Sequence, residues 1–346
     1  TLNVGGTTTT AAVLGITDNL LSHAATGTTL ALNTTSLVGA GSGVVSAGTI
    51  ADENGTIEVV NLTNTGVSSF TLSSAEVGTL AIGGAGSVTM PVNTTSLAGL
   101  TSLSIGGAVS FNDGSLSSTG TLTNGLGSFG SALTISNTTS GNVTASINGS
   151  KQAYTGGAGN DTIVLTADAT KAIVGGAGTD ELVLNSAVTY TAVNTGRNVS
   201  GFETLGLVTG GAYALDVAQL FSNTFTTLNV RGLDTSSTVS NLAQNASINF
   251  QNGTSSGTVL TVNYADKSGA TDNVTVTIGS ATNTEAKAVA GLQVQDANYA
   301  GIGTLNIVSN NLTQSSLTAV GATSNNTAGQ NAITTLSDVG LTNLNV

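Results

Sequence analysis

The 346-residue chain is predicted to be all-β, a β-solenoid or parallel β-roll with short β-hairpins and few short helices. Three observations predict this class: the composition, a recurring strand motif and a repeated glycine turn. The composition includes 46 Gly and 39% hydrophobic residues, but only 3% aromatic residues. Small residues suit narrow coils that stack closely. A string of β-sandwiches also uses short strands between turns and is the alternative.

The strand motif is a Thr, Ser or small residue followed by Leu, any residue, and Ile, Val or Leu. It occurs at residues 78–82 and 101–105, and again at 203–207 and 226–230, with the same 23-residue offset each time. Two further copies are at residues 303–307 and 342–346. A strand unit that recurs at a fixed spacing predicts coils stacked on one another.

The glycine turn is part of a nonapeptide that occurs twice, at residues 156–164 and 175–183. Both copies fit G-G-x-G-x-D-x-U-x, where U is a large apolar residue, which is the repeat of calcium-binding β-rolls. Glycines permit a tight turn, and aspartate supplies a hard oxygen ligand for Ca²⁺. The copies begin 19 residues apart. We therefore expect the two turns on the same edge, one coil apart, at a strand spacing of ~4.8 Å.

This spacing predicts a calcium ion shared between the turns, with Asp161 and Asp180 as ligands. The other candidate ligands are the carbonyl groups of Gly156, Ala158, Gly175 and Ala177, together with Asn160, Asp168 in the opposite half-turn, and Glu203. Residues 83–86 repeat the letters GGAG without a following aspartate, so no ion is expected there. A glycine-rich turn that needs no metal is the alternative.

Three regions are expected along the chain. Residues 1–150 form a solenoid-like repeat region, residues 151–210 the calcium roll, and residues 211–346 further β-rich repeats. Asp113, between Asn and Gly, is interpreted as a hairpin turn. A β-hairpin is predicted over residues 257–280, and short helices over residues 214–221 and 241–246.

The charge pattern limits the partners. The net charge is −12, and all six Lys and Arg lie from Lys151 onward, which argues against nucleic acid and anionic membranes. The chain has no Cys and no apolar stretch long enough for a transmembrane helix. Its first residues resemble the middle of a strand, so we expect a piece of a longer polypeptide. The acidic, cysteine-free composition and the calcium pattern favour an extracellular location.

Catalysis is not expected. His23 is the only histidine, so a Ser-His-Asp triad or a zinc site would depend on it alone. The adjacent carboxylates Asp52-Glu53 and Asp180-Glu181 lack the surrounding aromatic residues of a sugar-binding platform, which argues against a glycosidase.

Residues 155–165 (TGGAGNDTIVL), 171–184 (KAIVGGAGTDELVL) and 200–207 (SGFETLGL) together resemble the RTX-type bacterial surface-layer proteins. Residues 269–276 (GATDNVTV) and 300–307 (AGIGTLNI) resemble the family's repeating D-x-V/L strand and G-x-E-T-L-x-I strand, with Gly303 in place of the glutamate. The motif-level resemblance therefore covers residues 151–310. The resemblance implies type I secretion and binding of many Ca²⁺ ions. It also implies a lattice of copies on the cell surface, with cell-surface polysaccharide reached through an anchoring domain outside this stretch. A secreted adhesin or filament subunit, and the non-catalytic repeat part of a secreted RTX enzyme, are the alternatives.

Overall fold

The strands of this computed structural model are arranged as parallel β-coils. The structure describes residues 1–8, 12–16, 29–39, 46–52, 55–92, 96–116, 125–129, 132–185, 195–265, 273–279, 287–296, 302–310, 331–338 and 341–346. The only helices in these residues are the short 3-10 helices η1 (Leu126–Ser128), η2 (Thr195–Asn198) and η3 (Val217–Leu220). No helix in this part of the chain is long and apolar enough to cross a membrane. The all-β, solenoid-like prediction is confirmed.

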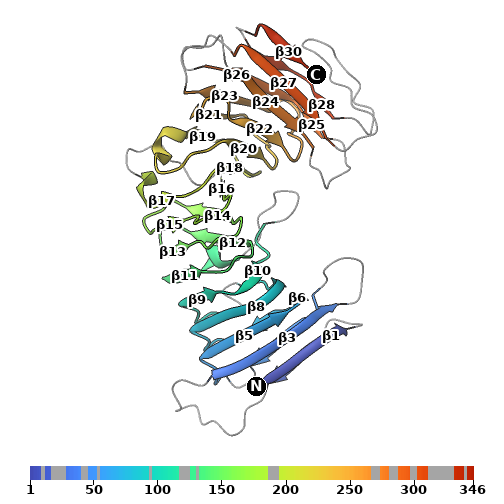
Figure 1. The fold of residues 1–346 in the computed structure, drawn as a ribbon, viewed down its shortest axis with the longest axis vertical. Coiled ribbons are helices and arrows are strands. Elements are labelled where there is room, and N and C mark those ends of the chain that lie inside the picture. The colour runs from blue at the N-terminus through green and yellow to red at the C-terminus, as the bar shows by residue number, and fades with distance from the viewer. Residues whose placement is uncertain are drawn as a thin grey trace. The chain divides into compact units, whose positions relative to one another are not determined.

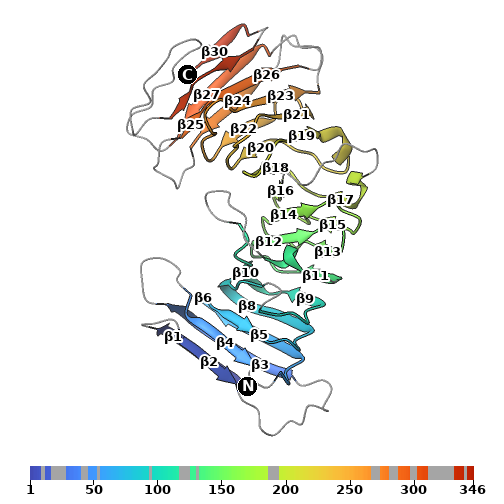
Figure 2. The ribbon, with the colours of Figure 1, turned by 180° about the vertical axis from the view of Figure 1, so that it is seen from behind.

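The chain divides into two compact units, with the boundary between Asp180 and Glu181. Strands of unit 1, which contains most of the chain before this boundary, are coloured blue to green in Figures 1 and 2. They are β1 (Leu2–Thr8), β2 (Ala12–Ile16), β3 (Thr29–Gly39), β4 (Gly48–Asp52), β5 (Val59–Thr65), β6 (Val67–Ser69), β7 (Thr71–Ser73), β8 (Thr79–Thr89), β9 (Ser102–Ile105), β10 (Ala108–Asn112), β11 (Leu133–Asn137), β12 (Val143–Asn148), β13 (Gln152–Thr155), β14 (Thr162–Ala167) and β15 (Ile173–Val174).

Unit 1 pairs its strands in three parallel series. One runs β1, β3, β5, β8, β9, β11, β13, β15, and a second runs β6, β8, β10, β12, β14. The third is β2, β4, β7. From β9 onward, successive strands alternate between the first two series, so each strand pairs with strands one coil away in the sequence.

Unit 2 has the same parallel construction. Its strands are β16 (Glu181–Leu184), β17 (Val199–Ser200), β18 (Thr204–Leu207), β19 (Ala214–Asp216), β20 (Thr227–Val230), β21 (Ser237–Leu242), β22 (Ser247–Phe250), β23 (Val259–Tyr264), β24 (Asn273–Ile278), β25 (Ala288–Val289), β26 (Gly291–Gln295), β27 (Thr304–Ser309), β28 (Ala332–Ile333), β29 (Leu336–Ser337) and β30 (Asn343–Asn345). One series runs β16, β18, β20, β22, β24, β27, β30. A second runs β19, β21, β23, β26, β29, and β25 pairs with β28.

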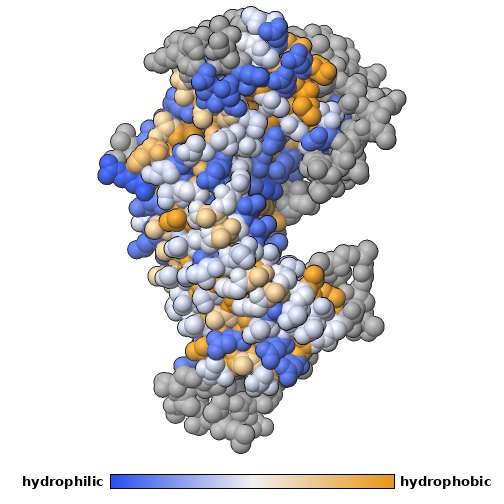
Figure 3. Space-filling view, viewed as in Figure 1, coloured by the Kyte–Doolittle hydropathy of each residue, from blue (hydrophilic) through white to orange (hydrophobic). Residues whose placement is uncertain are grey.

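Columns of apolar side chains form the core, because in-register parallel strands place equivalent residues above one another. In unit 2, one such column is Leu205, Leu228, Ile248 and Val276, each fully buried. The 23-residue offset correctly predicts the pairing of Leu205 with Leu228. The coloured surface in Figure 3 is pale over its middle part, with blue and orange patches elsewhere, and the chain has only 7% charged residues. The exposed large hydrophobic residues in the described ranges are Val67, Phe221, Val308, Leu344 and Val346.

The predicted hairpin at residues 257–280 is wrong. β23 pairs with β21 and β26, whereas β24 pairs with β22 and β27, all in parallel. Alternating apolar residues identified both strands correctly. Alternation does not, however, reveal whether a strand pairs with its sequence neighbour or with a strand one coil away. The expected turn, residues 266–272, lies outside the described residues.

Of the two predicted short helices, the first is present as a 3-10 helix over part of its range, and the second is absent. Residues 214–221 contain β19 and then the single 3-10 turn of η3, which begins where the Asp216 carboxylate accepts from the Ala218 amide at 3.0 Å. Residues 241–246 contain the end of β21 and a turn. Here Asn241 and Asn245 have φ of 58° and 61°, a left-handed conformation that a helix cannot contain.

Candidate metal centre

The two GGAG turns, residues 156–161 and 175–180, stack one coil apart as the 19-residue spacing predicts. Parallel pairing of β13 with β15 places Tyr154 beside Ile173. Beyond these strands, the Gly156 amide donates to the Val174 carbonyl at 2.8 Å, and the Ala177 amide donates to the Gly157 carbonyl at 2.8 Å. The turns are therefore held together by backbone hydrogen bonds.

A third turn, residues 139–143, lies against the first, and sequence reasoning missed it. The Ala158 amide donates to the Thr139 carbonyl at 3.1 Å. Asparagine side chains link all three turns, and we call this series the asparagine ladder. The backbone amide of Asn160 donates to Asn142 Oδ1, and the backbone amide of Thr179 donates to Asn160 Oδ1, both at 2.9 Å. The letters SGNV at residues 140–143 align with AGND at 158–161, with valine in place of aspartate, and this was the available signal.

Glycine is required in these turns by the close approach of successive coils. A β-carbon added at Gly159 would lie 2.1 Å from the Gly141 carbonyl oxygen, and one at Gly178 would lie 2.5 Å from the Gly159 carbonyl oxygen. Real β-carbons do not approach backbone atoms so closely. Stacking alone therefore explains why these positions are glycine, with or without a metal.

Asp161 is enclosed by hydrogen-bond donors. Its side chain is buried, with 1% exposure. Oδ2 accepts from the Tyr154 hydroxyl at 2.7 Å and from Asn137 Nδ2 at 2.9 Å, and Oδ1 accepts from the Val143 amide at 2.8 Å. The Gly157 amide is a further donor. A carboxylate accepts about four hydrogen bonds, so the acceptor positions of Asp161 are filled by protein groups.

Burial dominates the titration of this cluster. It raises the pKa of Asp161, and the hydrogen bonds from Tyr154, Val143 and Asn137 oppose that rise. Burial, and then the negative charge of Asp161, raise the pKa of the Tyr154 hydroxyl. The hydroxyl consequently keeps its proton at any ordinary pH and acts as a donor.

Asp180 is differently placed. Its side chain is fully buried, and its Oδ1 accepts from the Asp161 amide at 2.7 Å. Each aspartate thus reaches back to the preceding turn: Asp161 to the turn at residues 139–143, and Asp180 to the turn at residues 156–161. Only Asp180 places its carboxylate between the two GGAG turns.

The remaining predicted ligands are dispersed. Asn160 is exposed and serves the asparagine ladder. Asp168 is half-buried in the other turn of the coil, where the Thr170 amide donates to the Gly149 carbonyl at 2.9 Å. Glu203 belongs to unit 2. The described residues contain no cluster of three or more His, Cys, Asp or Glu side chains suited to hold an ion.

Asn137 and Tyr154, which hold Asp161, were not predicted. Asn137 pairs with Ile105, which in turn pairs with Ile82, so an amide continues a column that is apolar in the two preceding coils. Tyr154 pairs with Ile135 in the neighbouring column. The signal for both residues was a polar side chain at a column position that is apolar in neighbouring coils. This signal can be recognised only when the strand register is known.

Asp113 is the second enclosed carboxylate, and its interpretation as a hairpin turn is wrong. The side chain has 0% exposure. Its oxygens accept from the amides of Ser115 at 2.9 Å, Leu126 at 3.0 Å and Ser146 at 2.9 Å. A turn does form here, since the Gly114 amide donates to Asn112 Oδ1 at 2.8 Å. It leads to the next coil rather than to an antiparallel strand.

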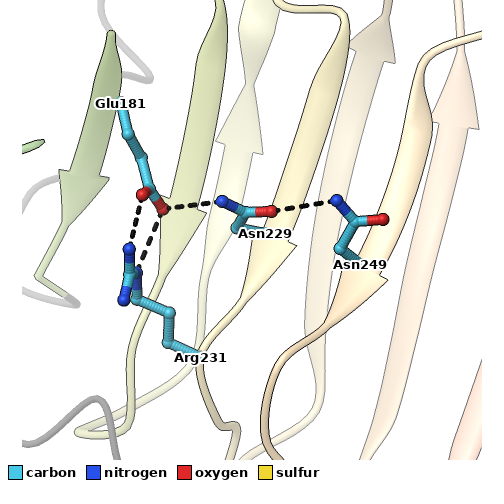
Figure 4. A network of polar contacts seen from close by, with 4 residues as sticks. All are labelled: Glu181, Asn229, Arg231 and Asn249. Atoms are coloured by element: carbon cyan, nitrogen blue, oxygen red, sulfur yellow. Dashed lines mark hydrogen bonds and ion pairs between the residues drawn. The ribbon is translucent and has the colours of Figure 1, made fainter. Parts of the chain in front are cut away.

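Glu181 anchors a polar network in unit 2 (Figure 4). Its carboxylate accepts from Arg231 Nε at 3.0 Å and from Asn229 Nδ2 at 3.1 Å, and Asn249 Nδ2 donates to Asn229 Oδ1 at 3.2 Å. The intervening strand, β18, carries Gly206, whose added β-carbon would lie 2.6 Å from Glu181 Oε1. Glycine at this position lets Glu181 reach two coils along.

The carboxylates considered for catalysis have structural contacts. Asp52 accepts from the Ile57 amide at 3.1 Å and the Ser74 hydroxyl at 2.9 Å. Glu181 is paired with Arg231. His23 and Glu53 lie outside the described residues.

We expect Tyr154→Phe to lower the free energy of unfolding by about 2 kcal/mol, because a charged carboxylate loses a buried donor. Tyr264→Phe is the matched control: its hydroxyl donates to the neutral Ala246 carbonyl at 2.7 Å, so the loss should be only about 1 kcal/mol. Urea denaturation followed by circular dichroism measures both. Equal losses would contradict the special role of the Tyr154 hydroxyl.

Comparison with known proteins leaves the family of this chain open. No protein-family model matches the chain, and neither the curated proteins nor the solved structures searched give a match.

Proposed function

We propose that the chain is a structural subunit of a calcium-dependent extracellular surface layer, built from copies of itself and without enzymatic activity. The observation that carries the proposal is the in-register stacking of two GGAG turns with a buried aspartate between them. The parallel coils support it, because they give a repeating, weakly charged surface suited to contacts that symmetry repeats. The resemblance of residues 151–310 to RTX-type surface-layer proteins supports the same assignment.

Calcium fits one of the two aspartates. Asp180 and the carbonyl groups of both GGAG turns are the hard oxygen ligands that Ca²⁺ prefers. Asp161 does not fit, because donors already surround its oxygens. We therefore assign calcium binding to Asp180 and the turn carbonyls, and assign Asp161 a metal-independent role in closing the preceding turn. The ion would contribute positive charge between turns of an acidic chain.

The location and partners follow from this assignment. We place the protein outside the cell, exported by a type I system, in agreement with its lack of cysteine and its net charge of −12. Calcium also offsets repulsion between acidic copies. An anchoring domain that binds cell-surface polysaccharide would belong to sequence outside these residues.

Calcium titrations of wild type, Asp180→Asn and Asp161→Asn test the separate roles assigned to the two aspartates. For wild type, we expect millimolar Ca²⁺ to raise the urea midpoint, since binding to the folded state alone stabilises it. Asp180→Asn should abolish this increment. Asp161→Asn should lower the midpoint in EGTA and in Ca²⁺ alike, and should retain the increment. Hydrogen exchange of residues 156–181 locates the effect.

Two outcomes would overturn the proposal in different ways. A wild-type midpoint that is identical in Ca²⁺ and EGTA would remove calcium from it. Light scattering and electron microscopy that show monomers at every Ca²⁺ concentration would remove the lattice, and would favour a secreted adhesin or an appendage of an enzyme.

A further inference from the structure

We propose that copies of this chain associate through unit 2, with Phe221 of one copy seated in a surface hollow around Ala290 of the next copy. This inference deepens the proposed function, on which it rests, by naming the surfaces that meet. Phe221 directly follows η3 and is 60% exposed. Of the chain's seven phenylalanines, the other six are at most 2% exposed. Phe221 is therefore the one phenylalanine outside the core.

Hydrogen bonds fix the turn that presents Phe221. Asn223 Nδ2 donates to the carbonyl groups of Leu220 and Val199, both at 3.0 Å, and Asn223 Oδ1 accepts from the Phe202 amide at 3.1 Å. Leu220, which precedes Phe221, is buried with 1% exposure. The exposed ring is thus held on an ordered turn, so little backbone entropy is lost when a partner covers it.

The hollow has a volume of about 340 Å³ and crosses three successive coils of unit 2. It is lined by part of the turn at residues 254–257, by Ala288 and Ala290, and by Thr334 and Thr335. The backbone amides of Ala290, Thr334 and Thr335 all donate within the coils. The lining contains no charged side chain. Its methyl and hydroxyl groups suit an uncharged side chain.

The ring and the hollow lie on opposite edges of the coils. In unit 2 the chain alternates between the series that contains β20 and the series that contains β21. Phe221 lies in a connection between β19 and β20, from the second of these series to the first. The lining residues lie in connections from the first series to the second, between β22 and β23, β24 and β26, and β27 and β29. Figures 1 and 2 show β19 and β25 on opposite sides of unit 2.

A second copy is the occupant that this arrangement favours. An aromatic side chain that fills a pocket is a common centre of protein interfaces, and this chain supplies both the side chain and the hollow. Because the two surfaces differ and lie on opposite edges, the contact is heterologous and continues from copy to copy as an open row. Such a row would form one direction of the lattice.

A tryptophan reporter tests the contact, because the natural chain has no tryptophan. In millimolar Ca²⁺, the fluorescence of Phe221→Trp should shift to shorter wavelength as protein concentration rises, since the ring then enters the hollow of another copy. Val308→Trp is the matched control in the same unit, at a residue with 41% exposure. Its emission should not shift.

A filled hollow provides the second arm of the experiment. Ala290 is half-buried in the lining, so Ala290→Leu should occupy the hollow and abolish the shift of Phe221→Trp in the double variant. An excess of Phe221→Ala protein, which has an open hollow and no ring, should restore the shift. Phe221→Ala alone should weaken association in sedimentation by roughly 10- to 100-fold. Thr335→Leu, at an exposed lining residue, is a second filling variant.

The outcomes separate this contact from the proposed function. A shift that both filling variants leave unchanged, or that Phe221→Ala protein fails to restore, would overturn the contact. If Phe221→Ala associates as strongly as wild type, the lattice stands without this contact. If wild type stays monomeric and Phe221→Trp never shifts, both the lattice and the contact are wrong. The Asp180→Asn calcium result does not depend on Phe221.

Discussion

Asp113→Ala is expected to lower the free energy of unfolding of unit 1 by about 4 kcal/mol. The side chain is fully buried and accepts from three backbone amides. One of these, Leu126 N, is the first amide of η1, whose N-cap residue Gly125 supplies no side-chain cap. Alanine would leave all three donors unsatisfied in the interior.

The measurement is urea denaturation by circular dichroism, with hydrogen exchange over residues 125–129 as the local readout. Glu76→Ala is the control: it also removes one carboxylate from unit 1, but at an exposed position, and should change stability by less than about 0.5 kcal/mol. Comparable losses for the two variants would show that Asp113 is not a structural centre.

The same residue predicts a pH dependence. Burial raises the pKa of Asp113 above its ordinary value of 3.8. The folded state therefore holds this proton to higher pH than the unfolded state does, and the resulting contribution to stability is greatest below pH 3.8. It is lost as pH rises through the raised pKa. Relative to Asp113→Asn, wild type should gain stability on acidification through this window, and a constant difference would contradict the shift.

Gly159→Ala is the second large effect, and we expect a loss of about 3 kcal/mol or more, in the range of severe overpacking. The added β-carbon would lie 2.1 Å from the Gly141 carbonyl oxygen, so the stacked turns must separate. Gly83→Ala is the matched control, since Gly83 opens another GGAG sequence but has nothing within 4 Å of an added β-carbon. That variant should be neutral or slightly stabilising, by up to about 1 kcal/mol.

Urea midpoints of both variants, in EGTA and in Ca²⁺, distinguish stacking from metal binding. If glycine at position 159 serves only the close approach of coils, the loss is the same in both solutions. A loss that appears only in Ca²⁺ would instead indicate that this glycine shapes an ion site.

The sequence predicts the fold better than it predicts the polar clusters. The motif spacing correctly pairs Leu80 with Leu103 and Leu205 with Leu228, because a solenoid repeats its register with its sequence. The hairpin at residues 257–280 failed because alternation specifies a strand and not its partner. The residues next to Asp113 in the sequence correctly indicate a turn. They do not indicate that the following coils bury its side chain.

Only part of the candidate metal centre can likewise be predicted from the sequence. Both GGAG turns and Asp180 follow from the nonapeptide alone. The donors to Asp161 come from Tyr154, 7 residues away, and Asn137, 24 residues away. These contacts depend on which columns meet inside the coil, so they become visible only when the register is known.

The reach of Glu181 across Gly206 to Arg231 affects how unit 2 comes apart. A stacked array with contacts only between adjacent repeats behaves as a one-dimensional chain that can lose repeats singly from an end. The Glu181–Arg231 pair joins β16 to the residue that directly follows β20, beyond the adjacent strand β18. Separating β16 from β18 therefore also breaks a bond to the repeat beyond β18. Under mechanical load, these three strands should rupture together as one block and give a single larger force step.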